Sequence, residues 1–489
     1  MPITALQINF SAVLTAKGRY GIIMMDFSLK IGLIPIRRDL ADAKTRKGIF
    51  EPAKAEDNKN HIVKYIKDTF TDDKTSFTDL EWLNEEGLLV SEFECDRVAE
   101  YLRNEKVDAI FLINCNFGNE EAAGQIAKKM KLPTLLWGPQ DMVFEADGVR
   151  YTDCQCGLFA ISKQLQRYHV PFTYINNCPV EDSRFTDGLK SFLSVASMVK
   201  NFNGMRITQV GTRLNPFKSV MYNELELTEK FGFNMQTVNM AVAEKRLYEI
   251  LESNRPLLAE EIKEVKEKYI TDLDDETLMR MLAFVHYYKE VFEKTNADVL
   301  STECWTSMPV AFKANPCLAM SILYNMGYIV ACESDIHGAV TSALLTAASR
   351  GEKATMFGEF TCRHPENKNA ELLWHCGPFP YSMKHKDVKA SLFNTKPSFR
   401  AKDGGYTIAR FQASGGKYSL LGGKFNTTDG PHTFGTYVWA EFNDLDKLER
   451  KLINGPYIHH MTEIYGDYTK ELEEFCKYIP GLEFDSLEG

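Results

Sequence analysis

The alternation of short apolar runs with segments of helical spacing constrains the fold of this chain more than any other feature. Apolar runs at residues 31–36, 107–113 and 133–137 lack polar alternation, which is typical of strands buried on both faces. Residues 120–130, which have helical spacing, separate the second run from the third. Strand, helix and strand in this order predict a parallel sheet with helices packed on its faces.

The same alternation continues after residue 173, and the pattern changes after about residue 353. Beyond that point glycine pairs at 404–405, 415–416 and 422–423 separate segments of β-type alternation, and we interpret these pairs as turns. The sequence therefore predicts two Rossmann-like, doubly wound α/β domains at 1–172 and 173–352. A mainly antiparallel β-rich domain is expected at 353–489, with a closing helix near 468–478.

Composition restricts the partners of the chain. It has 489 residues and a net charge of −10, so we expect neither nucleic acid nor an anionic membrane as a partner. Its eleven cysteines are scattered, which indicates reduced thiols in a cytoplasmic protein rather than a disulfide framework. The first residues do not resemble a signal peptide, and no apolar run is long enough for a transmembrane helix.

Two carboxylates follow apolar segments at positions suited to chemistry. Glu333 comes directly after the apolar residues 328–332, and Glu359 comes just after residues 354–357. Ligands of open parallel sheets bind beyond the carboxyl ends of the strands, so Glu333 is well placed for function. Ser334 or Asp335 could cap the helix that follows, and Glu359 could be an exposed charge at a strand end.

Imidazoles accompany these carboxylates. His375 follows an apolar run, where a hydrogen-bonded core residue is the alternative, and His459 and His460 precede the last expected helix. Oxygen ligands with one or two imidazoles suit Mn²⁺ or a similar divalent ion. Such an ion can hold two adjacent oxygens of a polyol and polarise a carbonyl, while the carboxylates transfer protons.

The ordered set of these segments resembles the L-fucose isomerase family, which is related to the L-arabinose isomerases. The carrying segments are ACESD with GAVTSALL at residues 331–345, LSVASM at 193–198, FGEF at 357–360 and HHMTEIYGDYTKELEEF at 459–475. Glu333 falls at the first metal-binding carboxylate of the family and Glu359, 26 residues later, at the second. His460 falls at its metal-binding histidine. The resemblance covers most of residues 173–489 and is weaker over 1–172.

The resemblance implies aldose–ketose isomerisation with Mn²⁺, in a homo-oligomer whose active site lies between subunits. Glu333 and Glu359 would bind the metal and move a proton between C1 and C2 through an enediol, with a hydride shift as the competing mechanism. His460 would complete the metal site. His375 falls near the fourth, imidazole ligand of arabinose isomerases, so it is a candidate ligand or substrate contact.

The chain also departs from the family in ways that leave the sugar open. It is shorter than typical fucose isomerases, and the Glu303–Trp305 segment differs from the Gln/Arg-rich segment of the family. Arg37 and Arg38 lie where the family reaches substrate from its first domain, and two guanidiniums would suit a sulfonate or phosphate. A sulfosugar or other 6-substituted hexose is therefore a candidate substrate. We expect further substrate contacts from Glu303, Trp305 and Trp439. The structural alternatives are that the two arginines are a solvated surface pair and that the two tryptophans are core residues.

Two other functions compete with a metal-dependent ketol isomerase. A non-catalytic sugar-binding or regulatory protein could use the same fold. An α/β enzyme with Cys332 or Cys376 as nucleophile is the third hypothesis, but the sequence pairs neither cysteine with a base. The joint presence of Glu333, Glu359 and His460 favours the isomerase.

Overall fold

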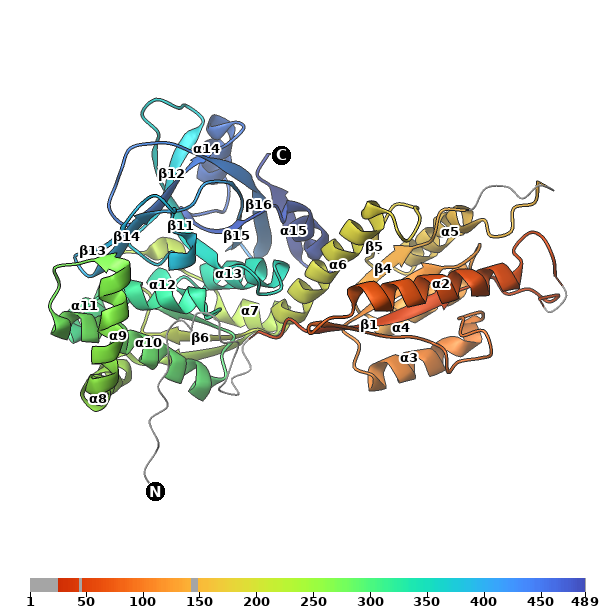
Figure 1. The fold of residues 1–489 in the computed structure, drawn as a ribbon, viewed down its shortest axis with the longest axis horizontal. Coiled ribbons are helices and arrows are strands. Elements are labelled where there is room, and N and C mark those ends of the chain that lie inside the picture. Colours follow the sequence, from red (N-terminus) through yellow and green to blue (C-terminus); the bar gives the residue numbers. More distant parts are fainter. Residues whose placement is uncertain (1–24, 44–45, 142–147, 489) are drawn as a thin grey trace, which may run out of the picture. The chain divides into compact units, whose positions relative to one another are not determined.

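The computed structural model describes residues 25–43, 46–141 and 148–488 (Figure 1). The first residues of the chain, on which the expectation of no signal peptide rests, lie outside these ranges. The chain groups into two compact units, one built from residues 27–200 with 474–480 and the other mainly from residues 201–473. The two compact units do not correspond one to one to the three predicted domains, because the first unit ends near residue 200 and the other joins α/β and β-rich parts. The three-domain division therefore stays a prediction.

The unit of residues 27–200 is a parallel sheet with the strand order β2-β1-β3-β4-β5. Side chains of β1 join two separate buried clusters, since Ile31 and Leu33 belong to one and Ile34 and Ile36 belong to the other. Both faces of the strand are covered, which explains why its sequence is continuously apolar. The elements are β1 (Leu29–Ile36), α2 (Pro52–Phe70), β2 (Thr75–Thr78), α3 (Cys95–Asn104), β3 (Ala109–Asn114), α4 (Glu120–Met130), β4 (Thr134–Trp137), α5 (Cys154–Arg167), β5 (Thr173–Tyr174) and α6 (Ser183–Phe202).

A second parallel sheet, with the order β10-β9-β6-β7, begins the other unit. Helix α13 (Ile336–Ala348) is buried along its whole length, because it packs between this sheet and strands of the β-rich part. This burial explains why GAVTSALL has no polar face. The other elements are β6 (Arg206–Val210), α7 (Glu224–Phe231), β7 (Asn234–Val238), α8 (Met240–Ser253), α9 (Arg255–Lys268), β8 (Tyr269–Ile270), α10 (Asp275–Thr295), β9 (Val299–Thr302), α11 (Ser307–Phe312), α12 (Cys317–Asn325) and β10 (Val330–Ala331).

The β-rich part contains a closed, mainly antiparallel barrel. Strands run in the order β16-β15-β18-β11-β12-β17, and the pairing of β16 with β17 closes the ring. The elements are β11 (Thr355–Arg363), β12 (Ala370–His375), β13 (Ala390–Phe393), β14 (Lys396–Arg400), β15 (Gly405–Ser414), β16 (Lys417–Thr428), β17 (Thr436–Glu441), α14 (Leu445–Asn454), β18 (His460–Tyr465), α15 (Thr469–Cys476) and β19 (Leu482–Ser486). Two doubly wound parallel sheets followed by an antiparallel β part confirm the predicted fold class.

Several local predictions in the β-rich part were wrong. Gly422 and Gly423 do not form a turn but lie inside β16, where a Cβ atom on Gly423 would come within 2.3 Å of Leu487. The pair therefore permits the close approach of the C-terminal segment. Glu359 lies within β11 rather than after a strand, and His460 begins β18 instead of preceding a helix. The predicted closing helix is α15, but β19 follows it.

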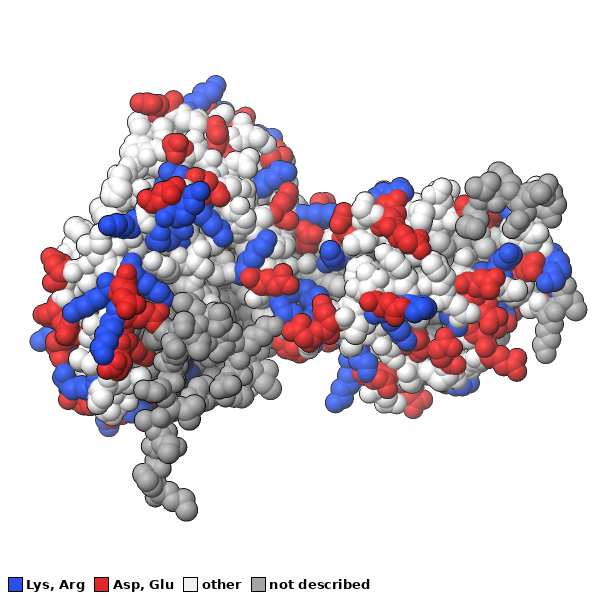
Figure 2. All heavy atoms as spheres, in the orientation of Figure 1, with Lys and Arg blue, Asp and Glu red and all other residues white. Residues whose placement is uncertain are grey.

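The surface charges and the hydropathy of the helices agree with what the composition of the chain predicts. Acidic and basic side chains are interspersed on the face shown in Figure 2. No helix of the described residues has both the length and the apolar character needed to cross a membrane.

Candidate metal and active site

Hydrogen bonds connect the loops that follow the strands of the second parallel sheet. Glu303 follows β9, and its carboxylate accepts hydrogen bonds from the backbone N–H of Thr212, after β6, at 3.0 Å and from the hydroxyl of Thr306 at 2.9 Å. Burial raises the pKa of Glu303, but hydrogen bonds from Ser307 and Thr212 lower it below its usual value. The ionised carboxylate thus braces the loops, and its predicted contact with substrate stays a prediction.

Glu333 lies in a strained segment directly after β10. Its φ is 62° and that of Ser334 is 58°, so two consecutive residues with side chains adopt the left-handed conformation. The Ser334 hydroxyl donates to the carbonyl of Thr212 at 2.8 Å, which helps to hold this backbone. The strain is concentrated at the first candidate carboxylate of the predicted site.

Three neighbouring barrel strands carry the other predicted ligands. Glu359 on β11 is paired directly with His460 on β18 and with Trp374 on β12. His375 is the last residue of β12. The antiparallel register therefore brings together residues that lie up to 101 positions apart in the sequence.

The structure brings four of the predicted site residues together within one compact unit. Nε2 of His460 lies 3.1 Å from Oε2 of Glu333 and 3.8 Å from Oε2 of Glu359. One ligand atom each from Glu333, His375 and His460 lie within 4.8 Å of one another, and the same holds for Glu359, His459 and His460. Glu333, Glu359, His375 and His460 form what we call the carboxylate–imidazole site.

Three buried polar atoms of this site form no hydrogen bond among the described residues: Nε2 of His375, Oε2 of Glu333 and Nε2 of His460. The last two are 3.1 Å apart, which is an ion-pair contact. Leaving buried polar atoms unpaired is costly, so such groups indicate a ligand or ion. Two carboxylates and one or two imidazoles fit a divalent ion of the Mn²⁺ class.

A buried ion pair orients His460. Nδ1 of His460 lies 3.0 Å from the carboxylate of Asp335, which also accepts the backbone N–H of Gly338 at 2.9 Å and a guanidinium hydrogen bond from Arg410 at 3.0 Å. Burial raises the pKa of Asp335, but Arg410 and His460 outweigh it and hold this pKa well below its usual range. The ionised carboxylate accepts a hydrogen bond from Nδ1–H and leaves Nε2 to face Glu333, an arrangement typical of metal-ligating histidines.

The electrostatics of Glu359 suit proton transfer. Burial raises its pKa, although His375 and His460 oppose the shift. Burial also lowers the pKa of His459 to about 4, so this imidazole, 3.5 Å from Glu359, is neutral at physiological pH. A carboxyl group with a raised pKa next to a neutral imidazole can act as either general acid or general base.

The predicted aromatic contacts have different surroundings. Trp305 is 39% exposed, and its ring meets Phe217, which also contacts the rings of His459 and His460. Trp439 is buried and packs with Leu372 and Tyr437, while its indole N–H donates to a backbone carbonyl. Trp305 thus lies one ring away from the carboxylate–imidazole site, and Trp439 has the surroundings of a core residue.

Arg37 and Arg38 belong to the other compact unit, and each contacts a carboxylate. Arg37 is 6% exposed and bonds to Glu86, with Nη2 3.0 Å from Oε1. Arg38 lies 3.5 Å from Glu120, and its guanidinium stacks 4.4 Å from the ring centroid of Phe117. Their predicted role in binding an anionic substituent stays a prediction.

Sequence reasoning missed several residues around the site. The sequence marks Asp335 only as a possible helix cap, although its place two residues after Glu333 is a usable signal. Arg410, on β15, carries no local motif. Glu463 on β18 is buried with both carboxylate oxygens unpaired among the described residues, and burial raises its pKa to about 8. Nothing in the sequence around Arg410 or Glu463 indicates that these side chains are enclosed.

Comparison with known proteins identifies relatives of both the first α/β part and most of the chain. Residues 43–203 match the family model described as fucose/sulfoquinovose isomerase, N-terminal domain. Two proteins named sulfoquinovose isomerase, from Priestia aryabhattai and Priestia megaterium, are each 26% identical over 408 residues, covering 81% of this chain and 89% of the relative. A third of that name, from Alkalicoccus urumqiensis, is 25% identical over 391 residues, covering 78% of this chain and 86% of the relative.

The family model matches the first part of the chain, where the resemblance inferred from the sequence is weaker. The carboxylate–imidazole site lies in residues 173–489, where that resemblance is stronger. Together with the observed fold, these similarities fit a divergent fucose isomerase-like protein.

Proposed function

We propose that this protein is a metal-dependent aldose–ketose isomerase whose substrate is a sulfosugar such as sulfoquinovose. The observation that carries the proposal is the convergence of Glu333, Glu359, His375 and His460, where Oε2 of Glu333 and Nε2 of both imidazoles are buried and form no hydrogen bond among the described residues. The relatives named sulfoquinovose isomerase favour a sulfonated substrate. The isomerase is expected to be a cytoplasmic homo-oligomer with the site near a subunit interface. All eleven cysteines are free thiols, which supports a reducing compartment.

Glu333, Glu359 and His460 would hold the metal ion, which we infer to be Mn²⁺. When bound, this ion would supply charge stabilisation for the two adjacent sugar oxygens and polarise the carbonyl. Asp335 keeps the His460 imidazole oriented for this role, and His375 is either a further ligand or a contact to the sugar.

The carboxylates of the chain would perform the proton transfer. One of them removes the proton from C2 of the open-chain aldose, and the resulting enediol is protonated at C1 to give the 2-ketose. Glu359 is the stronger candidate for the shuttle, because burial raises its pKa and a neutral imidazole lies beside it. Glu333 is then mainly a ligand, held by its strained backbone.

A sugar panel tests the proposal. The protein is stripped of metal with EDTA, reloaded with Mn²⁺, and incubated with sulfoquinovose, L-fucose, L-arabinose and glucose, and ketose formation is followed by NMR. We expect metal-dependent conversion that is fastest with sulfoquinovose. Sugar binding without turnover would instead support the non-catalytic sugar-binding alternative, and conversion of neutral sugars alone would refute the sulfosugar.

The same reaction in D₂O distinguishes the two mechanisms. Transfer by a carboxylate exposes the proton to exchange with solvent, so deuterium should appear at C1 of the ketose. Complete retention of the substrate hydrogen would favour a hydride shift.

A further inference from the structure

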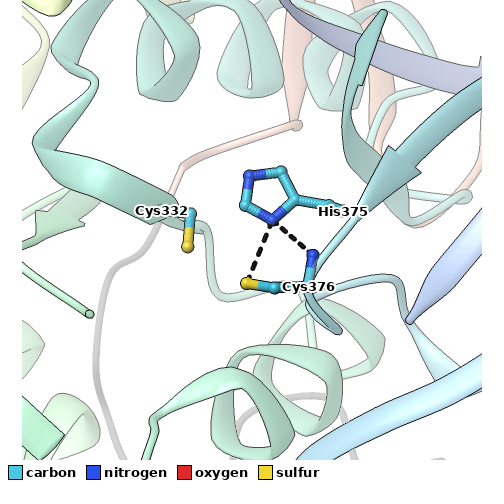
Figure 3. A group of neighbouring side chains, drawn as sticks. All are labelled: Cys332, His375 and Cys376. Atoms are coloured by element: carbon cyan, nitrogen blue, oxygen red, sulfur yellow. Dashed lines mark hydrogen bonds between the residues drawn. The ribbon is translucent and has the colours of Figure 1, made fainter. Parts of the chain in front are cut away.

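The carboxylate–imidazole site is closed on the side where cysteines adjoin His375. Sγ of Cys376 lies 3.3 Å from Nδ1 of His375, and Cys332 lies nearby (Figure 3). Ligand atoms of the three residues lie within 4.8 Å of one another. Because His375 is 1% exposed and Cys332 is 0% exposed, a sugar must reach the carboxylates from another side.

Partly exposed side chains show where the site opens. The side chain of His459 is 37% exposed and that of Glu359 is 18% exposed. Trp305, which follows β9, is 39% exposed. The half-buried ring of Phe217 contacts two of these residues, with its centroid 5.6 Å from that of Trp305 and 5.9 Å from that of His459. Phe217 therefore borders the open side of the site.

The loop that carries Phe217 comes from the same sheet edge as Glu333. Glu333 follows β10, Trp305 follows β9, and Phe217 lies in the loop after β6. These three parallel strands are neighbours in the order β10-β9-β6. Ligands of open parallel sheets bind beyond the carboxyl ends of the strands. Each of three neighbouring strands thus contributes one side chain around the same site.

Hydrogen bonds fix this loop in place. The guanidinium of Arg213 donates to the carbonyl of Leu214 at 2.8 Å and to that of Phe217 at 3.0 Å. The carbonyl of Thr212 accepts the hydroxyl of Ser334, so the loop is also joined to the segment that holds Glu333. The ring is therefore positioned before a ligand binds, which lowers the entropic cost of binding.

The chemistry of a phenyl ring limits what Phe217 can do at this place. It can neither bind a metal ion as these carboxylates can nor transfer a proton. It offers apolar surface, and small-molecule sites combine such surface with a few polar groups that fix orientation. The hydroxyl groups of a sugar require hydrogen bonds or a metal ion, whereas its C–H faces are apolar and suit aromatic rings.

We propose that Phe217 and Trp305 form an aromatic wall that contacts the C–H face of the sugar. Phe217 is the new substrate contact, since the sequence indicated only Trp305. The wall holds the sugar so that its hydroxyl groups face Glu359 and the imidazoles. This inference rests on the proposed function for the identity of the sugar, but it requires binding and not turnover.

Tryptophan fluorescence of the Mn²⁺-loaded full-length protein, titrated with sulfoquinovose at saturating Mn²⁺, tests the proposal. We expect a saturable change in wild type whose amplitude falls in Trp305→Phe. Phe217→Ala should weaken binding by about tenfold, the effect of losing one aromatic contact. KM should rise in proportion with kcat nearly unchanged, because the contact is made in the ground state and the transition state alike.

Three further variants separate a contact with the sugar from a structural role. Phe217→Tyr keeps the ring and should bind sulfoquinovose as wild type does. Phe217→Leu keeps most of the apolar volume without the flat ring and should also weaken binding. Phe159→Ala removes a phenylalanine on α5 that is 67% exposed and should change nothing. Equilibrium titration with Mn²⁺ should give the wild-type affinity in every Phe217 variant.

The outcomes distinguish the aromatic wall from the isomerase. Wild-type affinity for sulfoquinovose in Phe217→Ala would overturn the wall. Weaker Mn²⁺ binding with unchanged sugar binding would overturn it too, because the ring would then only support His460. Sugar binding that depends on Phe217 in a protein that forms no ketose would refute the isomerase and leave the wall in place. Absence of sulfoquinovose binding to wild type would refute both.

Discussion

The two parallel sheets of this chain differ in how their carboxyl-terminal edges are occupied. After β1, Arg37 and Arg38 contact carboxylates, and Asn116 accepts the backbone N–H of Arg38 at 2.9 Å. After β10, the buried Oε2 of Glu333 forms no hydrogen bond among the described residues and lies 3.1 Å from Nε2 of His460. The first edge pairs its arginines with carboxylates, and the second brings a carboxylate and an imidazole together. Similar folds therefore do not imply similar chemistry, because the available donor atoms decide where a ligand can bind.

Removing the carboxylate of Glu359 should have a large effect on turnover, comparable with that of removing Glu333. We expect Glu359→Gln to lower kcat by about 10²–10⁴-fold, the usual contribution of a general acid or base, with the fold retained. Steady-state kinetics of the Mn²⁺-loaded protein and thermal unfolding check both parts. A variant with the wild-type kcat would exclude Glu359 from proton transfer.

Breaking the ion pairs of the two regions should have unequal costs. Arg410→Met leaves Asp335 buried without its guanidinium partner, so we expect a loss of about 3–5 kcal/mol in the free energy of unfolding. Arg37→Met removes a pair whose Glu86 partner is 31% exposed, and we expect a loss nearer to about 1 kcal/mol. Urea unfolding measures both, and equal losses would contradict the contrast.

The raised pKa of Glu463 predicts how the free energy of unfolding depends on pH. Its folded-state pKa of about 8 exceeds the ordinary value of 4.5, so the folded state retains a proton that the unfolded state releases. Stability should therefore fall as pH rises from about 4.5 to about 8 and then level off. Glu463→Gln removes this loss. At about pH 8.5 the variant should be more stable than wild type by a few kcal/mol, since each pKa unit corresponds to roughly 1.4 kcal/mol. At about pH 4.5 the two proteins should be equally stable.

The matched control for this prediction is Glu483→Gln on β19, where the side chain is exposed. It should not change the pH dependence. A Glu463→Gln protein with the same pH profile as wild type would show that the buried carboxyl is not neutral in the folded state.

Asp335 should affect the metal site through His460. We expect Asp335→Asn to weaken Mn²⁺ binding by about 10–100-fold, as is usual when the partner of a ligating histidine is altered. Asp298→Asn, which alters a carboxylate paired with Arg206 at the start of β6, serves as the control. Equilibrium titration with Mn²⁺ measures the affinities, and unchanged binding in Asp335→Asn would separate Asp335 from the metal site.

The smallest effect is expected from the first sheet. If the predicted role of Arg38 holds, Arg38→Ala should raise KM for sulfoquinovose by about tenfold, the value of one charge-assisted hydrogen bond, and leave KM for a neutral sugar unchanged. Kinetics with both sugars check this. Equal changes for both would reject a contact with the sulfonate.

A feature of the molecule could be predicted from the sequence where its signal lies within one short segment. The strand–helix alternation predicted both parallel sheets, because buried strands and helices carry their own patterns. Glu333, Glu359 and His460 were found through an ordered resemblance, although two of them were placed on the wrong kind of element. The places of Arg410 and Glu463 could not be predicted, since only antiparallel pairing and the packing of α13 against the barrel strands bring them to the site.

The central claim is tested most directly by comparing two carboxylates of similar burial. Glu333 and Glu371 are 8% and 9% exposed, but only Glu333 belongs to the carboxylate–imidazole site, while Glu371 lies on β12 opposite Arg363. With Mn²⁺ and sulfoquinovose, we predict that Glu333→Gln loses about 10³-fold or more in turnover and that Glu371→Gln retains it. Full turnover in Glu333→Gln, or an equal loss in both variants, would contradict this assignment of the site.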